Sequence, residues 1–175
     1  MRNRFYITLL LLSLFSCGPS KVVYDYDEAV SFNGYKTYNI YPNLDSGLSQ
    51  LDEKRVLQVI DEVLQAKAFV KSDTPDFYVN VIAKEYVSQN NSSIGVGIGT
   101  GGRGGGIGVS GGIPIPKTNV NQVLIIDIID VKKDALIWKA EKDSKLSRNA
   151  DPLQKEAYFQ KVITQIFSNF PPQKK

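Results

Sequence analysis

Histidine is absent from this chain of 175 residues, and cysteine occurs once, as Cys17. Histidine is the commonest general base and the commonest metal ligand in proteins. Its absence excludes Ser-His-Asp and Cys-His catalysis and zinc sites of the usual kind. A single cysteine also excludes disulfides within the chain, so the fold has to depend on its hydrophobic core. We therefore expect no catalytic residue, no metal and no cofactor.

The apolar run near the start of the chain is too short to cross a membrane. Phe5–Phe15 has eleven residues, whereas a transmembrane helix needs about 20. A run of this length after the positively charged Arg2 and Arg4 is typical of a secretory signal. We predict that residues 1–16 form a signal peptide.

The run ends in Leu14-Phe15-Ser16-Cys17, which resembles the lipobox of bacterial lipoproteins. In those proteins the cysteine carries fatty acids such as palmitate, the peptide before it is removed, and the new amino terminus is acylated. The resemblance implies lipidation of Cys17, although Phe15 is bulkier than the usual residue at its position. The alternative is an ordinary secretory signal in which the cysteine is incidental.

An anchor at Cys17 would attach the domain to a membrane surface through a short tether, residues 17–20. Each buried methylene contributes about 0.8 kcal/mol, and two or more acyl chains bind firmly. Gly18 stands where lipoproteins retained at the inner membrane usually have Asp. By resemblance to these sorting rules, we expect an outer-membrane lipoprotein that faces the periplasm, with the membrane as its partner.

The chain has no strong net charge of either sign. Removing Arg2 and Arg4 with residues 1–16 leaves 19 basic and 18 acidic residues, a net charge of +1. Nucleic-acid binding calls for a strongly basic face, so we expect no nucleic-acid partner. The remaining length suits one domain with its own core, which we place at residues 21–175.

Glycine, in contrast, is concentrated in one segment. Ser93–Ile113 holds 11 of the 14 glycines, and we treat residues 92–113 as a glycine-rich insertion. Gly97–Gly102 fits the G-x-G-x-x-G pattern of dinucleotide-binding loops, which need a helix directly after them. The next residues are Arg103-Gly104-Gly105-Gly106, and each glycine costs about 1 kcal/mol inside a helix. We therefore expect no nucleotide at this segment.

The insertion alternates apolar residues with glycine on both of its arms. The outgoing arm carries Ile94, Val96 and Ile98, the returning arm carries Ile107 and Val109, and Arg103 lies near the tip. This pattern predicts a hairpin-like loop. One interpretation is a mobile connection between two strands. The other is an adhesive ribbon that pairs with the sheet edge of a partner or lies on a membrane.

The rest of the chain alternates between strand and helix patterns. Period-two alternation predicts strands at Lys21–Asp27, Tyr35–Tyr41, Phe77–Val87, Asn119–Val131 and Ala135–Lys142, and in the third of them Phe77, Val79, Val81 and Ala83 face inward. Apolar stripes predict helices from Ser49 to about Ala68 and from Asp151 to Phe170. Ser49, with Asp52 three residues on, and Asp151, followed by Pro152, are the expected caps. In the last strand we expect Leu136, Trp138 and Ala140 on one face. The expected fold class is α+β: an antiparallel sheet of about five strands, its last three in a meander, with two helices packed on one face, plus the glycine-rich hairpin-like loop.

Carboxylates are the acid–base groups that remain. Asp25 and Asp27 share one side of the first predicted strand and could pair for acid–base work or calcium binding, but a solvated strand face is the favoured interpretation. Asp127 lies in a nearly continuous apolar run, where a buried carboxylate requires a partner. We expect a structural hydrogen bond or an edge position for it.

Five stretches, in this order and spacing, resemble a known family. They are VVYDYDEAVSFNGYKTYNIYP from Val22, LDEKRVLQVIDEVLQAKAFV from Leu51, PDFYVNV from Pro75, VLIIDIIDVKKDALIWKA from Val123 and FSNFPP from Phe167. They are similar to a family of Gram-negative envelope lipoproteins catalogued only as a domain of unknown function, number four-one-three-six. Ala68 and Ala140 stand where its members often have Gly. The resemblance implies an envelope lipoprotein and carries no enzymatic activity and no binding residue.

Three functional hypotheses follow. The first is a lipid-anchored, non-catalytic binding or accessory module of a periplasmic or outer-membrane assembly, with an envelope protein as its partner. The second is a structural lipoprotein that associates with itself through the glycine-rich ribbon. The third, an enzyme that uses only the carboxylates of Asp25, Asp27 and Asp127, has the least support.

Overall fold

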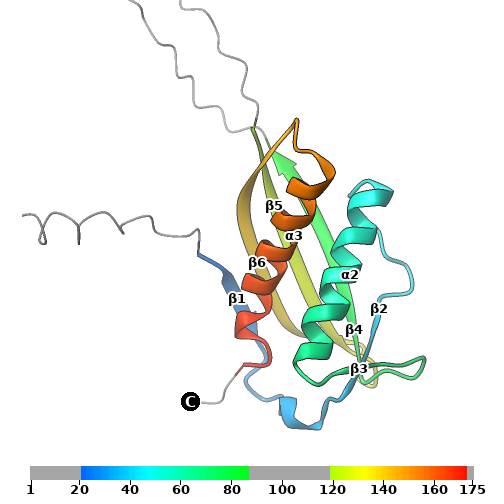
Figure 1. Ribbon diagram of the computed structural model, residues 1–175. Coiled ribbons are helices and arrows are strands. Elements are labelled where there is room, and N and C mark those ends of the chain that lie inside the picture. Colours follow the sequence, from blue (N-terminus) through cyan, green and yellow to red (C-terminus); the bar gives the residue numbers. More distant parts are fainter. Residues whose placement is uncertain (1–20, 87–118, 173–175) are drawn as a thin grey trace, which may run out of the picture.

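The computed structural model describes residues 21–86 and 119–172, which form an α+β fold. A six-stranded sheet carries the helices α2 and α3 on one of its faces (Figure 1). The strands are β1 (Val23–Tyr26), β2 (Thr37–Ile40), β3 (Val70–Lys71), β4 (Phe77–Tyr86), β5 (Asn119–Asp130) and β6 (Ala135–Ser147). The helices are α2 (Gln50–Ala66) and α3 (Pro152–Ile166), with short 3-10 turns at η2 (Phe32–Gly34) and η3 (Phe167–Asn169).

Three of the predicted segments lie outside the described residues. They are the signal peptide 1–16, the tether 17–20 and the glycine-rich insertion 92–113. Within residues 21–86 and 119–172, no helix combines the length and the apolar character needed to cross a membrane.

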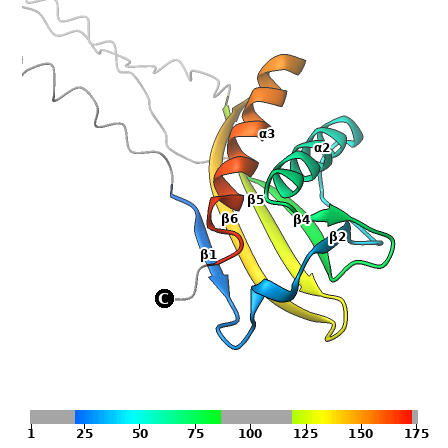
Figure 2. The ribbon, with the colours of Figure 1, turned by 60° about the horizontal axis from the view of Figure 1, so that its bottom comes forward.

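The last three strands form the predicted antiparallel meander. The sheet order is β1-β6-β5-β4-β2-β3, so β4, β5 and β6 are neighbours in space as they are in sequence. β4 pairs with β5 from Phe77↔Asp130 to Tyr86↔Asn121, and β6 pairs with β5 along its whole length. Figure 2 shows β4, β5 and β6 beneath the two helices.

The prediction of a purely antiparallel sheet of about five strands is wrong at one edge. β2 runs parallel to β4 and to the additional strand β3. The cause is α2, which carries the chain from the end of β2 back along the sheet, so that β4 enters in the same direction as β2. The sheet is therefore mixed and has six strands. β3 was not predicted because a strand of two residues shows no periodicity.

A second prediction, the face assignment in β6, is wrong because this strand contains a β-bulge. Leu136, Trp138 and Ala140 were expected on one face, but the register with β5 shifts by one residue at this point, which leaves Ile137 without an opposite residue. Leu136 is 52% exposed, whereas Trp138 and Ala140 are fully buried. The bulge adds Ile137 to the buried side, and Leu136 turns toward solvent.

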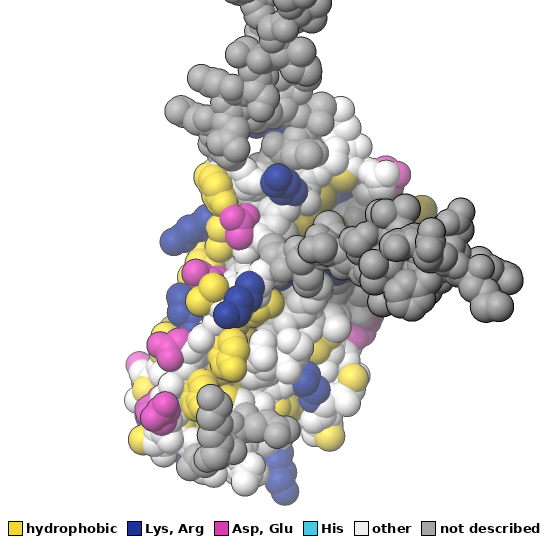
Figure 3. All heavy atoms as spheres, turned by 90° about the vertical axis from the view of Figure 1, so that its left-hand side faces the viewer, with side chains coloured by type: hydrophobic (Ala, Val, Ile, Leu, Met, Phe, Trp, Pro, Cys, Tyr) yellow, Lys and Arg dark blue, Asp and Glu magenta, His cyan; other side chains and the backbone are white. Residues whose placement is uncertain are grey.

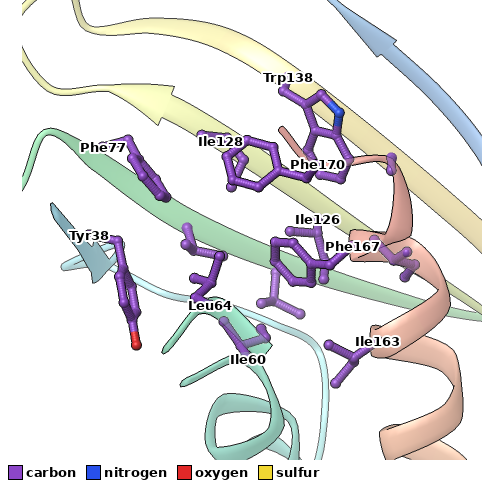
Figure 4. Packing of buried hydrophobic residues seen from close by; sticks show 14 of the residues in the cluster. Tyr38, Ile60, Leu64, Phe77, Ile126, Ile128, Trp138, Ile163, Phe167 and Phe170 are labelled. Atoms are coloured by element: carbon purple, nitrogen blue, oxygen red, sulfur yellow. The ribbon is translucent and has the colours of Figure 1, made fainter. Parts of the chain in front are cut away.

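The core lies between the sheet and the two helices. α2 contributes Val56, Val59, Ile60 and Leu64, and α3 contributes Phe159, Val162, Ile163 and Ile166. Figure 4 shows Ile60 and Leu64 of α2 and Ile163 of α3 on the helix side of this layer, facing sheet residues such as Ile126 and Ile128. Among the described residues, every member of the core cluster lies between Val30 and Phe170, so this core lies within the predicted domain, residues 21–175.

The helix starts follow their predicted capping signals. Ser49 Oγ accepts a hydrogen bond from the backbone N–H of Asp52 at the start of α2. Asp151 and Gln154 form a capping box at the start of α3, with Pro152 in the first helical turn. Both helices begin at the same end of the sheet (Figure 1), and this end carries the site described below.

Ala68, just after α2, has a φ of 66°, in the left-handed region. A side chain there costs about 1–2 kcal/mol relative to glycine, which is partly offset by the greater freedom of glycine in the unfolded chain. Ala68→Gly is therefore expected to raise the free energy of unfolding by about 0.5–1 kcal/mol in chemical denaturation. Ala66→Gly is the matched control: inside the last turn of α2 it should lower stability by about 1 kcal/mol. Equal losses at both positions would contradict this explanation.

Candidate functional site

The glycine-rich insertion connects two neighbouring strands at the end of the sheet where the helices begin. Its predicted interaction residues, Ile94, Val96, Ile98, Arg103, Ile107 and Val109, lie outside the described residues, as does Cys17. Its flanks are described: β4 ends at Tyr86, β5 begins at Asn119, and Tyr86 is opposite Asn121. The two described flanks of the insertion therefore lie side by side at this end of the sheet.

A cleft of about 300 Å³ lies at this end of the sheet, and we call it the polar cleft. Its lining comes from the loop before α2, the ends of the central strands and the start of α3: Gly47, Leu48, Ser49, Asp52, Glu85, Gln122, Leu146, Ser147, Arg148 and Lys155. Gly47 has a φ of 70°, and a Cβ there would lie 3.0 Å from the carbonyl oxygen of Ala83. Glycine is thus required for this loop to close onto β4.

Asp52 is the charged centre of the polar cleft. One carboxylate oxygen lies 2.8 Å from Arg55 Nη1, and the other lies 2.8 Å from Lys155 Nζ. Burial alone raises the pKa of Asp52, but hydrogen bonds from Lys155 and Ser49 and the charges of Lys155 and Arg55 outweigh it and hold the pKa below its ordinary value. Because Lys155 belongs to α3, the ion pair joins the first turns of the two helices.

A chain of hydrogen-bonded polar groups lies beside this ion pair. Gln122 is only 2% exposed on β5. The Tyr158 hydroxyl donates to Gln122 Oε1 at 3.2 Å and lies 2.6 Å from Ser144 Oγ, while Gln122 Nε2 lies 3.5 Å from Glu85 Oε1. Burial raises the pKa of Tyr158, which keeps its hydroxyl protonated. These groups therefore satisfy one another's hydrogen bonds beside the charges of the cleft.

A second cavity, of about 400 Å³, lies beside the outer edge of β6. It is lined by Asn121, Lys142, Asp143, Ser144, Lys145, Lys161, Val162 and Gln165. Burial, and next the neighbouring charge of Lys161, lower the pKa of Lys142, and Asp143 acts in the opposite direction. We call this space the edge cavity. Among the described residues, the Oε1 atom of Gln165 is buried without a hydrogen-bond partner.

The classification of the chain rests on a family comparison. The profile of the family described as a domain of unknown function, DUF4136, matches residues 22–172. The chain belongs to this family. The resemblance noted in the sequence is confirmed for the family itself, and no curated protein matches this DUF4136 domain significantly.

Solved structures share the fold of the DUF4136 domain. A PDZ domain protein from Parabacteroides distasonis ATCC 8503 has a TM-score of 0.58 at 16% identity, and the match covers 89% of this chain but 36% of that one. A PelC dodecamer from Paraburkholderia phytofirmans has a TM-score of 0.53 at 12% identity over 89% of this chain and 100% of that one. A PelC variant in another crystal form gives 0.51 at 12% identity over 86% and 95%. At these identities the likeness shows the fold alone.

The carboxylates considered for catalysis have structural partners in the DUF4136 domain. Asp127 lies 3.3 Å from Lys139 Nζ, and Asp25 is opposite Lys139 on the neighbouring strand. Asp25 and Asp27 also accept hydrogen bonds from backbone amides one and two residues further on. On the side where β1 and β6 lie, acidic and basic side chains are interspersed with hydrophobic ones (Figure 3). No group of three or more potential metal ligands occurs in the part of the chain that the structure describes.

Sequence reasoning found one half of the polar cleft and missed the other. The pattern from Ser49 to Asp52 predicted a helix cap, and the structure confirms it. Nothing in the pattern indicated Lys155, because it lies 103 residues from Asp52 and meets it only when the two helices pack. Gln122 carried a weak signal: it is an uncharged polar residue directly before a long apolar run, and it is buried in the sheet.

Proposed function

We propose that this DUF4136 domain is a lipid-anchored, non-catalytic binding or accessory module of an assembly in the bacterial envelope. The observation that carries the proposal is the motif Leu14-Phe15-Ser16-Cys17 directly before the folded domain, whose first strand begins at Val23. The residues from Cys17 to Val22 reach at most about 20 Å. A lipid on Cys17 would therefore keep the domain close to the membrane surface. Gly18 in place of Asp favours the outer membrane and its periplasmic side.

The polar cleft supports binding rather than turnover. Catalytic groups are held in environments that shift their pKa toward the working pH. Here the pKa of Asp52 moves down and that of Tyr158 moves up, both away from neutrality. Asp52 is neutralised by Lys155 and Arg55. An arrangement of this kind fixes the shape of a surface and presents polar groups to a partner.

The similar solved structures agree with a role in a larger assembly. The PelC structures are dodecamers, so a domain of this fold forms part of a multi-subunit complex in at least that protein. At 12% identity, the likeness supports a shared fold but not a shared partner. For this chain the partner is proposed to be a protein of the envelope, held at short range by the anchor.

Cys17→Ser in the full-length chain tests the proposal in a Gram-negative host. The unmodified chain is expected to incorporate labelled palmitate, to sediment with the outer membrane and to be joined to a defined envelope protein by chemical cross-linking. The Cys17→Ser chain should lose the label and the sedimentation, because no acyl chain remains to hold it. Ser16→Ala, which keeps a small residue before the cysteine, should behave like the unmodified chain.

Two results would count against the proposal. If the unmodified chain stays unlabelled and soluble, it carries no lipid anchor. If the purified domain converts a substrate at an appreciable rate, the proposed non-catalytic role is wrong.

A further inference from the structure

One edge of the sheet is covered over only part of its length. β6 runs from Ala135 to Ser147, but β1 pairs with it only from Trp138 to Glu141. Asp143–Ser147, which we call the open edge, pairs with β5 on its inner side and has no strand on its outer side among the described residues. An uncovered edge presents backbone N–H and C=O groups with which another strand can pair.

The side chains of the open edge are complementary to those of a second copy. Asp143 and Lys145 are two residues apart, so they point to the same face of the strand, and both are exposed. The Tyr86 hydroxyl donates a hydrogen bond to Asp143, which holds the carboxylate on that face. When two open edges pair antiparallel about Ser144, Asp143 of each copy stands opposite Lys145 of the other. The pairing forms two ion pairs related by a two-fold axis through Ser144.

The opposite face of β6 is also compatible with this antiparallel pairing of two copies. In this register Leu146 of the second copy stands opposite Lys142, at the edge cavity of about 400 Å³. Val162 of α3 lines this cavity and supplies an apolar surface for a leucine side chain. One register therefore pairs the exposed charges on one face and brings an apolar side chain to a cavity on the other.

We propose that two copies of this domain associate through their open edges, in antiparallel register about Ser144, to form one continuous sheet. A second copy fits better than an unrelated strand, because the acidic and basic residues needed for pairing are both present, in the required order, on the edge itself. The interface does not use the lipid anchor or the glycine-rich insertion. Its test therefore gives an answer whether or not Cys17 is lipidated.

Charge reversal in residues 21–175, which include every described residue of the core, provides the test. Dimer dissociation is measured by sedimentation velocity. Asp143→Lys places Lys opposite Lys145 twice, and is expected to raise the dissociation constant about tenfold; Lys145→Asp should do the same. The double change Asp143→Lys with Lys145→Asp exchanges the two charges and should restore the dissociation constant to within about threefold of the original. High salt should weaken the original dimer.

Lys133→Asp is the matched control, because Lys133 is exposed in the turn between β5 and β6, at the opposite end of these strands from the open edge. It should leave the dissociation constant unchanged. Thermal unfolding of each variant verifies that the domain remains folded. A domain that stays monomeric at the highest concentration reached, or a double variant as weak as the single ones, would overturn the proposal.

The register is tested by two single-cysteine chains, Asp143→Cys and Lys145→Cys. Residues 21–175 contain no other cysteine. The proposed register places position 143 of one copy opposite position 145 of the other, so a mixture of the two chains should form more disulfide-linked dimer than either chain alone. A dimer that shows no such preference for the mixture would overturn the proposed interface.

Discussion

Replacing Phe77 by Ala is expected to lower the free energy of unfolding by about 3–5 kcal/mol. Phe77 is fully buried at the start of β4. Its ring centroid lies 5.4 Å from that of Phe69, 5.8 Å from Phe170, 6.1 Å from Tyr35 and 6.2 Å from Tyr38. These rings come from four separate parts of the chain, and Figure 4 shows Phe77 between Tyr38 and the group around Phe170. Removing the ring would leave a cavity that no single element can close.

Tyr24→Ala is the control for this change. Tyr24 is 44% exposed on the edge strand β1, and the one described ring that it stacks on is Tyr26, at 6.5 Å. Its loss should change the free energy of unfolding by less than about 1 kcal/mol. Chemical denaturation followed by circular dichroism measures both variants. Similar losses at the two positions would show that the core is not centred on Phe77.

The surroundings of Phe77 show what local sequence patterns can predict and what they cannot. Alternation predicted that Phe77, Val79, Val81 and Ala83 face inward; the first three are buried and Ala83 is half-buried. The same alternation could not indicate that Phe170, at the far end of the chain, would pack against Phe77. Periodicity reports which side of an element is apolar, whereas the partner on that side is decided by the whole chain.

The errors in the predicted fold have the same origin. The caps at Ser49 and Asp151 were correct because they depend on contacts within four residues. The parallel pairing of β2 with β4 depends on the path of α2 between them, and the bulge at Ile137 depends on the match between two long strands. Neither the parallel pairing nor the bulge can be detected from the local composition of the sequence. The polar cleft follows the same rule, since it is built from the starts of two helices and the ends of three strands.

Replacing Asp52 by Ala is expected to lower the free energy of unfolding at neutral pH by about 2–3 kcal/mol. The change removes the hydrogen-bonded ion pairs to Lys155 and Arg55 and the contact between the Asp52 carboxylate and Ser49 Oγ. It also leaves Lys155 in the polar cleft without the carboxylate that now accepts from it. Glu62→Ala, at an exposed position of the same helix, should cost less than about 0.5 kcal/mol.

Asp52 should also contribute to acid unfolding. Its pKa in the folded chain is below the ordinary value of 3.8. The stability that the ionised form provides is therefore complete above that value and is lost as the pH falls through the lower pKa of the folded chain. The pKa of Asp76 is lowered first by hydrogen bonds from the backbone amides of Lys36 and Thr37, so it acts in the same direction.

Burial alone raises the pKa of Asp130, but hydrogen bonds from Tyr35 and from two backbone amides outweigh it, so this third carboxylate also loses stabilising charge in acid. Asp52→Asn keeps the size of the side chain and removes one of the three titrations. Its free energy of unfolding should fall less steeply than that of the unmodified chain as the pH falls below about 4. Glu62→Gln should leave the slope unchanged.

A double-mutant cycle of Asp52→Asn with Lys155→Met separates this ion pair from the other carboxylates. If the salt bridge is the source of the pH dependence, the coupling energy between the two residues should be favourable at neutral pH and should shrink toward zero as Asp52 becomes protonated. A coupling energy near zero at neutral pH would mean that Asp52 and Lys155 act separately. The first turns of α2 and α3 would then be held together by apolar packing alone.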